Sequence, residues 1–226
     1  MARPVLFVLA GANGAGKSSV GGHLLQLAGL AWFNPDDFAR ELVAATGCGQ
    51  TEANAAAWHE GLRRLDEALA QGRSHAFETT LGGNTIPARL QVAARTHDVM
   101  VWYCGLASPE HHLSRVRARV VAGGHDIPEA KIRERVVTAL QNLITLLPHI
   151  AHLQVYDNST HAAPGESVPD PVLVAETHAG KLGWPTTLAA LRDTPPWAKP
   201  LLEAALSLSG DKATVVFNRA CIADQV

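Results

Sequence analysis

The sequence predicts an α/β protein, a three-layer sandwich built on a mostly parallel sheet of five strands. Short apolar runs, of which 5–10 and 99–106 are the clearest, alternate with longer segments rich in helix-forming residues. A continuous apolar run is typical of a parallel strand buried on both faces. Apolar residues make up 47% of the 226 residues and charged residues 18%, which favours a sizeable core over a disordered or coiled-coil chain.

The elements follow from these runs and from helix start and stop signals. Glycines at 29, 72 and 123–124 end helical patterns, and Thr51 is a plausible helix cap. We expect strands over 5–10, 31–34, 74–78, 99–106 and 153–156, and helices over 18–28, 35–45, 51–71, 85–96, 108–122 and 128–147. After a loop at 161–171, we expect an edge strand over 172–177 and helices over 188–192 and 198–208.

The expected domain organisation is a core over residues 1–160, with a lid formed by the helices at about 108–148. Residues 161–226 are expected to form a C-terminal extension packed on the same domain.

Charge and cysteine content restrict the partners and the compartment. The formal net charge is −2 and neither end carries a basic block, so no attraction to nucleic acid or to an anionic membrane is indicated. No stretch reaches the ~20 apolar residues of a membrane span. The three cysteines are widely spaced and form no metal-like pair, which favours a reduced, cytoplasmic compartment.

Residues 11–18 form a complete G-x-x-x-x-G-K-[ST] motif between a predicted strand and a predicted helix. Glycines let successive backbone N–H groups turn toward phosphate oxygens, and the following helix presents its positive end. Lys17 is expected to bind the β- and γ-phosphates and the Ser18 hydroxyl to bind Mg²⁺. The predicted nucleotide-binding residues are Gly11, Asn13, Gly14, Ala15, Gly16, Lys17, Ser18 and Ser19.

The rest of the chain narrows the class of P-loop protein. An Asn-Lys-x-Asp guanine-binding motif is absent from the sequence, and the strand at 99–106 does not end in the acidic residue of a Walker-B ATPase. Of the classes of P-loop protein, the kinase-like class is left, in which acidic residues lie at strand ends and arginines lie on a lid.

Two acidic positions follow predicted strands at the carboxyl edge of the sheet, where open α/β proteins bind ligands. Asp36 is the candidate general base for an acceptor hydroxyl. Helix capping is the alternative for Asp36 and the preferred role for Asp37. Glu78, followed by Thr79 and Thr80, is a candidate for binding acceptor hydroxyls or a metal-bound water.

Five arginines lie on the two lid helices, where guanidinium groups can neutralise charge on a transferring phosphoryl group. The alternative is a solvated face paired with Glu129 and Glu134. Arg119 is the first candidate, since it shares a face of its helix with Arg115, four positions earlier. The five are Arg115, Arg117, Arg119, Arg133 and Arg135.

With these motifs in order, the chain resembles the zeta-toxin family of P-loop kinases, specifically its small stand-alone bacterial members. The P-loop alone is generic, whereas the whole set, spread over roughly residues 5 to 160, is specific. The segments are AGANGAGKSS (10–19), FNPDD (33–37), FETTL (77–81), SPE (108–110), RVRARV (115–120), GGHDIP (123–128) and YDNS (156–159).

The resemblance implies a kinase fold with a helical lid, use of ATP and Mg²⁺, and phosphorylation of a UDP-N-acetyl amino sugar at a hydroxyl. By position it makes Asp36 the base, Glu78 an acceptor-site carboxylate and Arg119, with Arg133 or Arg135, the lid clamp. It also places Asn158 near the adenine and raises an antitoxin protein as a partner. Kinases of another small-molecule acceptor (a nucleoside, a sugar or an antibiotic) and a nucleotide-binding switch or slow NTPase without an acceptor remain as alternatives.

Overall fold

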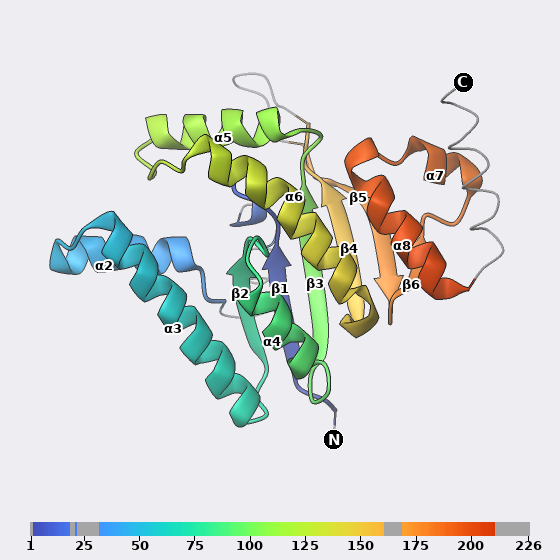
Figure 1. The fold of residues 1–226 in the computed structure, drawn as a ribbon, viewed down its shortest axis with the longest axis horizontal. Coiled ribbons are helices and arrows are strands. Elements are labelled where there is room, and N and C mark those ends of the chain that lie inside the picture. The colour runs from blue at the N-terminus through green and yellow to red at the C-terminus, as the bar shows by residue number, and fades with distance from the viewer. Residues whose placement is uncertain (1, 19–20, 22–31, 161–168, 211–226) are drawn as a thin grey trace.

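The computed structural model describes residues 2–18, 21, 32–160 and 169–210. It is an α/β fold whose six strands lie in the order β2-β1-β3-β4-β5-β6 (Figure 1). The strands are β1 (Val5–Ala10), β2 (His75–Thr79), β3 (Asp98–Gly105), β4 (His152–Asp157), β5 (Val172–His178) and β6 (Lys181–Trp184). The helices are α2 (Pro35–Thr46), α3 (Gln50–Ala70), α4 (Thr85–Ala93), α5 (Pro109–Val121), α6 (Glu129–Leu146), α7 (Leu188–Asp193) and α8 (Lys199–Ser209), with 3-10 turns at Leu147–His149 and Pro196–Ala198.

The sheet is mostly parallel, as predicted. Strands β2, β1, β3 and β4 run parallel, and β5 and β6 are added in antiparallel pairings. Four of the five strands expected over residues 5–156 form, because the segment at 31–34 contributes only an isolated bridge between Phe33 and Phe77. The expected edge strand at 172–177 is β5, and the unexpected strand β6 pairs with it and forms the edge, which brings the sheet to six strands.

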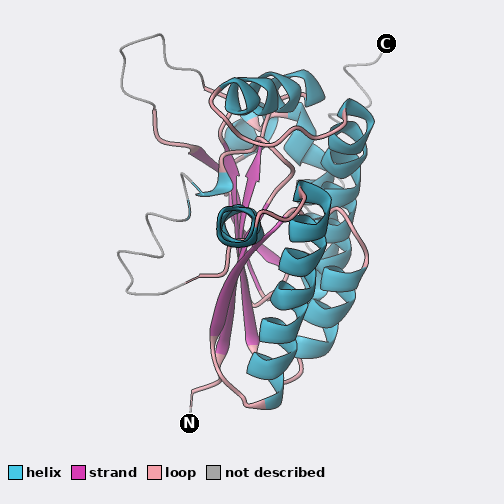
Figure 2. Cartoon of the chain, turned by 90° about the vertical axis from the view of Figure 1, so that its left-hand side faces the viewer, coloured by secondary structure: helices cyan, strands magenta, loops and turns pink. Residues whose placement is uncertain are grey.

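The main core lies between the sheet and helices α4, α6 and α8, which Figure 2 shows gathered along one face of the sheet. Alternate side chains of the strands, such as Val101 and Leu153, belong to the same buried cluster as Leu143 of α6 and Leu202 of α8. The alternation arises because successive strand residues point to opposite faces. The helix expected over 18–28 lies mainly outside the described residues.

The C-terminal segment completes this core. Leu201, Leu202 and Ala205 of α8 are fully buried in it, and the backbone N–H of Leu182 in β6 donates to Ser209 Oγ at 3.2 Å. Residues 169–210 therefore share both the sheet and the core with the residues before them.

Two helical pairs flank the carboxyl ends of the parallel strands (Figure 1). Helices α2 and α3 pack through small side chains, Ala39 against Ala53 and Ala57. Helices α5 and α6 form the predicted lid pair and enclose their own small core around Val116 and Ile132. Each pair leaves polar side chains facing the sheet edge, where the P-loop lies.

None of the helices in the described part of the chain combines the length and the apolar character needed to cross a bilayer.

Candidate active site

The glycines of the motif at 11–18 adopt backbone angles that require glycine. Gly11, Gly14 and Gly16 have φ values of 140°, 81° and 85°. A Cβ at Gly11 would overlap the carbonyl oxygen of Cys104 in β3, and a Cβ at Gly16 would overlap the amide nitrogen of Asn158. The loop thus curls tightly against the ends of β3 and β4, and the chain becomes helical at Lys17. This is the geometry of a phosphate-binding loop.

Lys17 is buried and paired with Glu78. Its Nζ lies 3.4 Å from Glu78 Oε1, with side chains 7% and 10% exposed, and it also donates to the carbonyl of Ala12 at 3.3 Å. The Ser18 hydroxyl donates to Glu78 Oε2 at 2.8 Å. Parallel pairing of β1 with β2 sets Leu9 opposite Glu78 and so brings the carboxylate to the loop.

Asn34, and not an aspartate, caps helix α2. Its Oδ1 accepts the backbone N–H groups of Asp36 at 2.9 Å and Asp37 at 3.4 Å. The capping role expected for Asp37 is therefore wrong, because Asn34 already occupies the cap position, and the Asp37 carboxylate instead pairs with Arg40 at 2.6 Å. The Asp36 carboxylate is likewise not used by the cap.

Two lid arginines reach across to the site. Arg119 Nη1 lies 3.3 Å from Asp36 Oδ2, and Arg135 Nη1 donates to Asn13 Oδ1 in the P-loop at 2.8 Å. Partial burial is the main cause that lowers the pKa of Arg135 from its ordinary value. Nε and Nη2 of Arg119 are shielded from solvent and have no acceptor within the described residues. Arg119 thus lies beside the candidate base, and Arg135 beside the predicted phosphate-binding loop.

The other predicted clamp residue, Arg133, is held elsewhere. Its guanidinium pairs with Glu110 and Glu129, both at 2.8 Å, and Arg117 pairs with Glu129 at 3.3 Å. These two arginines form the solvated, acid-paired face that was the alternative for the lid helices. Of the pair Arg133 and Arg135, the structure brings Arg135 to the P-loop.

His112 of α5 also contacts the P-loop, a contact that no motif in the sequence predicts. Its Nδ1 lies 2.8 Å from the carbonyl oxygen of Asn13. Burial is the main cause that lowers the pKa of His112 to about 4, so the ring is neutral near pH 7. A carbonyl oxygen only accepts, so the Nδ1 atom carries the proton.

Asn158 follows β4 and binds the P-loop backbone. Its Nδ2 donates to the carbonyl of Ala15 at 3.0 Å, and its own carbonyl accepts from Arg115 Nη2 at 2.6 Å. Asn158 and Arg115 therefore fix the loop from the side of β4. The proximity to adenine expected for Asn158 stays a prediction.

A cavity of about 370 Å³ joins these elements. The hydroxyls of Thr79 and Thr80 accept the backbone N–H groups of Leu81 and Gly82, which holds both threonines at its wall. Its polar and charged lining includes Asn13, Lys17, Asn34, Asp36, Glu78, Thr79, Thr80 and Arg135, and its aromatic lining is Phe33, Trp58 and Phe77. The predicted substrate-binding residues thus share one cavity with the P-loop lysine, whereas Ser19 lies outside the described residues.

The donor set fits Mg²⁺ and a triphosphate. The Ser18 hydroxyl and the Glu78 carboxylate, 2.8 Å apart, are hard oxygen ligands of the kind Mg²⁺ prefers. The glycine loop, Lys17 and the lid arginines provide the N–H groups and positive charge that phosphate oxygens accept.

The family of the chain follows from a sequence match. The model of a family described as an AAA domain matches residues 6–138, more than half of the chain. The chain belongs to the AAA domain family. The match covers the P-loop, the α2–α3 pair, α5 and part of α6 of this AAA domain protein. A search of the curated proteins finds no match to it.

Solved structures show the same fold as this AAA domain protein. The AvrRxo1-ORF1:-ORF2 structure with ATP has a TM-score of 0.60 and 19% identity, over 80% of this chain and 60% of that chain. The Pnkp1/Rnl/Hen1 RNA repair complex has a TM-score of 0.51 and 17% identity, over 64% and 47%. The PezAT chromosomal toxin-antitoxin system of Streptococcus pneumoniae has a TM-score of 0.48 and 16% identity, over 70% and 68%. The first two structures share the α/β fold of this chain.

Proposed function

We propose that this AAA domain protein is an ATP-dependent kinase that transfers the γ-phosphate to a hydroxyl group of a small molecule. One observation carries the proposal. The Asp36 carboxylate, which the helix cap leaves unused, lines the same cavity as the P-loop lysine, Lys17. A base for an acceptor and a ligand for the donor phosphate therefore line the same cavity.

The phosphate side of the site is formed by Lys17, Arg119 and Arg135. Lys17 exchanges its contact with Glu78 for the β- and γ-phosphates, and the arginines neutralise charge on the transferring group. Ser18 and Glu78 would hold Mg²⁺, which when bound offsets negative charge on the phosphate oxygens.

The acceptor side is formed by Asp36. Its carboxylate takes the proton of the acceptor hydroxyl as the oxygen forms its bond to the γ-phosphorus, and the bond from that phosphorus to the bridging oxygen of ADP breaks. Arg119, 3.3 Å away, orients the carboxylate.

The cavity wall suits an acceptor with a ring and several hydroxyls. Thr79, Thr80 and Asn54 offer polar groups, while Trp58 and Phe33 offer aromatic faces. Its volume of about 370 Å³ falls in the range of small-molecule pockets. A UDP-N-acetyl amino sugar is the acceptor that the zeta-toxin resemblance implies, and we propose it as the first to test. An antitoxin partner stays a prediction of the same resemblance.

The test is ADP release by purified protein with Mg²⁺-ATP, with and without UDP-N-acetylglucosamine, using Lys17→Ala as the blank. We expect stimulation by the sugar nucleotide and a phosphorylated product in the mass spectrum. Asp36→Asn is expected to lower transfer at least a hundredfold with nucleotide binding unchanged. Asp37→Asn is the matched control, because Asp37 pairs with Arg40 at the surface.

The outcomes separate the alternatives. Full transfer by Asp36→Asn would refute the base assignment. If ATP binds and ADP release is stimulated by a nucleoside, a sugar or an antibiotic but not by the sugar nucleotide, the protein is a kinase of that other acceptor. Tight binding with slow hydrolysis under every acceptor would favour a nucleotide-binding switch instead of a kinase.

A further inference from the structure

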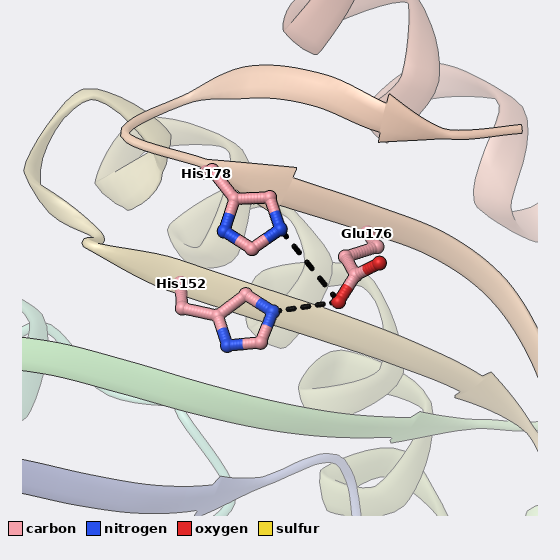
Figure 3. Close-up of side chains that lie close together, drawn as sticks. All are labelled: His152, Glu176 and His178. Carbon is pink, nitrogen blue, oxygen red and sulfur yellow. Dashed lines mark hydrogen bonds and ion pairs between the residues drawn. The ribbon is translucent and has the colours of Figure 1, made fainter. Parts of the chain in front are cut away.

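Three potential metal ligands lie together on one face of the sheet, away from the phosphate-binding loop. His152 belongs to β4, and Glu176 and His178 belong to β5 (Figure 3). The antiparallel register sets His152 opposite His178 and Gln154 opposite Glu176. Because residues two apart on a strand share a face, the three side chains project to the same side.

The ligand atoms are already close to one another. His152 Nε2 lies 2.7 Å and His178 Nε2 3.8 Å from the same oxygen, Glu176 Oε1. The three ligand atoms lie within 4.8 Å of one another, and among the residues that the structure describes this is the one such group of three. Ligands of a tetrahedral Zn²⁺ are about 3.4 Å apart. To reach that spacing the 2.7 Å contact of His152 with Glu176 lengthens by about 0.7 Å, and His178, whose side chain is 63% exposed, moves closer to Glu176.

We propose that His152, Glu176 and His178 bind a divalent transition-metal ion of the zinc type. Two imidazoles and one carboxylate are ligands that zinc accepts, and imidazole nitrogen selects such ions over Mg²⁺. His152 Nε2 gives up its proton to solvent, or carries it on Nδ1 instead, so that the lone pair binds the metal. The exposed side of His178 leaves a fourth position for water.

Neighbouring side chains fix the carboxylate. Gln154 Nε2 donates to Glu176 Oε1 at 3.1 Å, and Tyr156 donates its hydroxyl to Gln154 Oε1 at 3.1 Å. Such outer hydrogen bonds orient metal ligands. The two histidine rings stack with centroids 4.4 Å apart and an angle of 10°, so both imidazoles are held on the same side as the carboxylate.

The position indicates a structural role for the ion. The P-loop contacts the end of β3 next to Tyr156, whereas His152 lies four residues earlier on β4, about 13 Å along the strand. The ion would join β4 to β5, where the sheet changes from parallel to antiparallel pairing. It would thus stabilise the folded chain and leave the reaction centre untouched.

The experiment is calorimetric titration of the untagged, nucleotide-free full chain with Zn²⁺, together with thermal unfolding. We expect one Zn²⁺ bound per chain at this site, and a Tm rise of roughly 5–10 °C at a hundredfold excess over Kd. His178→Gln and Glu176→Gln are expected to weaken binding at least tenfold and to abolish the Tm rise. Unfolding in a chelator shows that each variant is folded.

Two controls separate this site from others. His149→Gln removes an exposed histidine outside the cluster, and Ser18→Ala removes the predicted magnesium ligand of the P-loop. Both are expected to bind Zn²⁺ like the wild type. Absence of stoichiometric Zn²⁺ binding, equal affinity of His178→Gln and the wild type, or an equal loss in His149→Gln would overturn the proposal.

Discussion

We expect the substitution Arg119→Ala to abolish transfer without destabilising the fold. The ion pair with Asp36 spans 3.3 Å between side chains 37% and 46% exposed, so its loss costs at most about 1 kcal/mol. The substitution also removes Nε and Nη2, two shielded donors without acceptors in the described structure, each of which costs about 1–3 kcal/mol. The free energy of unfolding should therefore stay within about 1 kcal/mol of the wild type or increase.

The activity should behave differently. A guanidinium that stabilises a transferring phosphoryl group contributes about 10³-fold or more to kcat. The assay is acceptor-dependent ADP release beside urea unfolding of the same preparation. Arg117→Ala is the matched control, because Arg117 lies on the same helix and pairs with Glu129 at the surface. A variant at position 119 that keeps more than about a tenth of kcat, or that loses about 2 kcal/mol or more of stability, would refute the reasoning.

Three further predictions concern the loop, the pH dependence and the cavity. Gly16→Ala is expected to weaken binding of a fluorescent ATP analogue at least tenfold, because φ is 85° and a Cβ would overlap Asn158; unchanged affinity would contradict the loop geometry. The pKa of His112 in the folded chain, about 4, lies below its value of about 6.5 in the unfolded chain. The free energy of unfolding should therefore not depend on this group above pH 6.5 and should fall by up to about 3 kcal/mol as the pH drops toward 4. Urea unfolding at pH 7 and pH 5 measures this loss, which His112→Gln should flatten. Trp58→Ala should raise the KM for the acceptor about tenfold with kcat little changed, and a drop in kcat alone would place the acceptor elsewhere.

The sequence predicts the features that depend on local pattern. The loop at 11–18 carries its own backbone requirements, and the apolar run of β1 fixes its position. Glu78 is predictable because it lies near the carboxyl end of β2, and Asp36 because it follows Phe33, whose isolated bridge to Phe77 is parallel; parallel pairing brings carboxyl ends to one edge.

Contacts between distant residues do not follow from local pattern. Arg135 meets Asn13 across 122 positions of sequence, and His112 meets the same residue across 99. Arg133 and Arg135, two positions apart, lie on different faces of α6, and which face turns toward the P-loop depends on the packing of α5 on α6. Strand β6 is missed because it is four residues long and largely exposed.

The buried ion pair of Lys17 and Glu78 links the affinities of anions and cations at this site. An anion that draws the ammonium group away leaves the carboxylate of Glu78, only 10% exposed, without its counter-charge. An unpaired buried charge costs several kcal/mol, and a cation that arrives at Glu78 with the anion removes that cost. The anion and the cation therefore bind cooperatively, and each raises the affinity for the other by the same factor. The affinity for nucleotide measured without metal and the affinity measured with metal would differ by that factor.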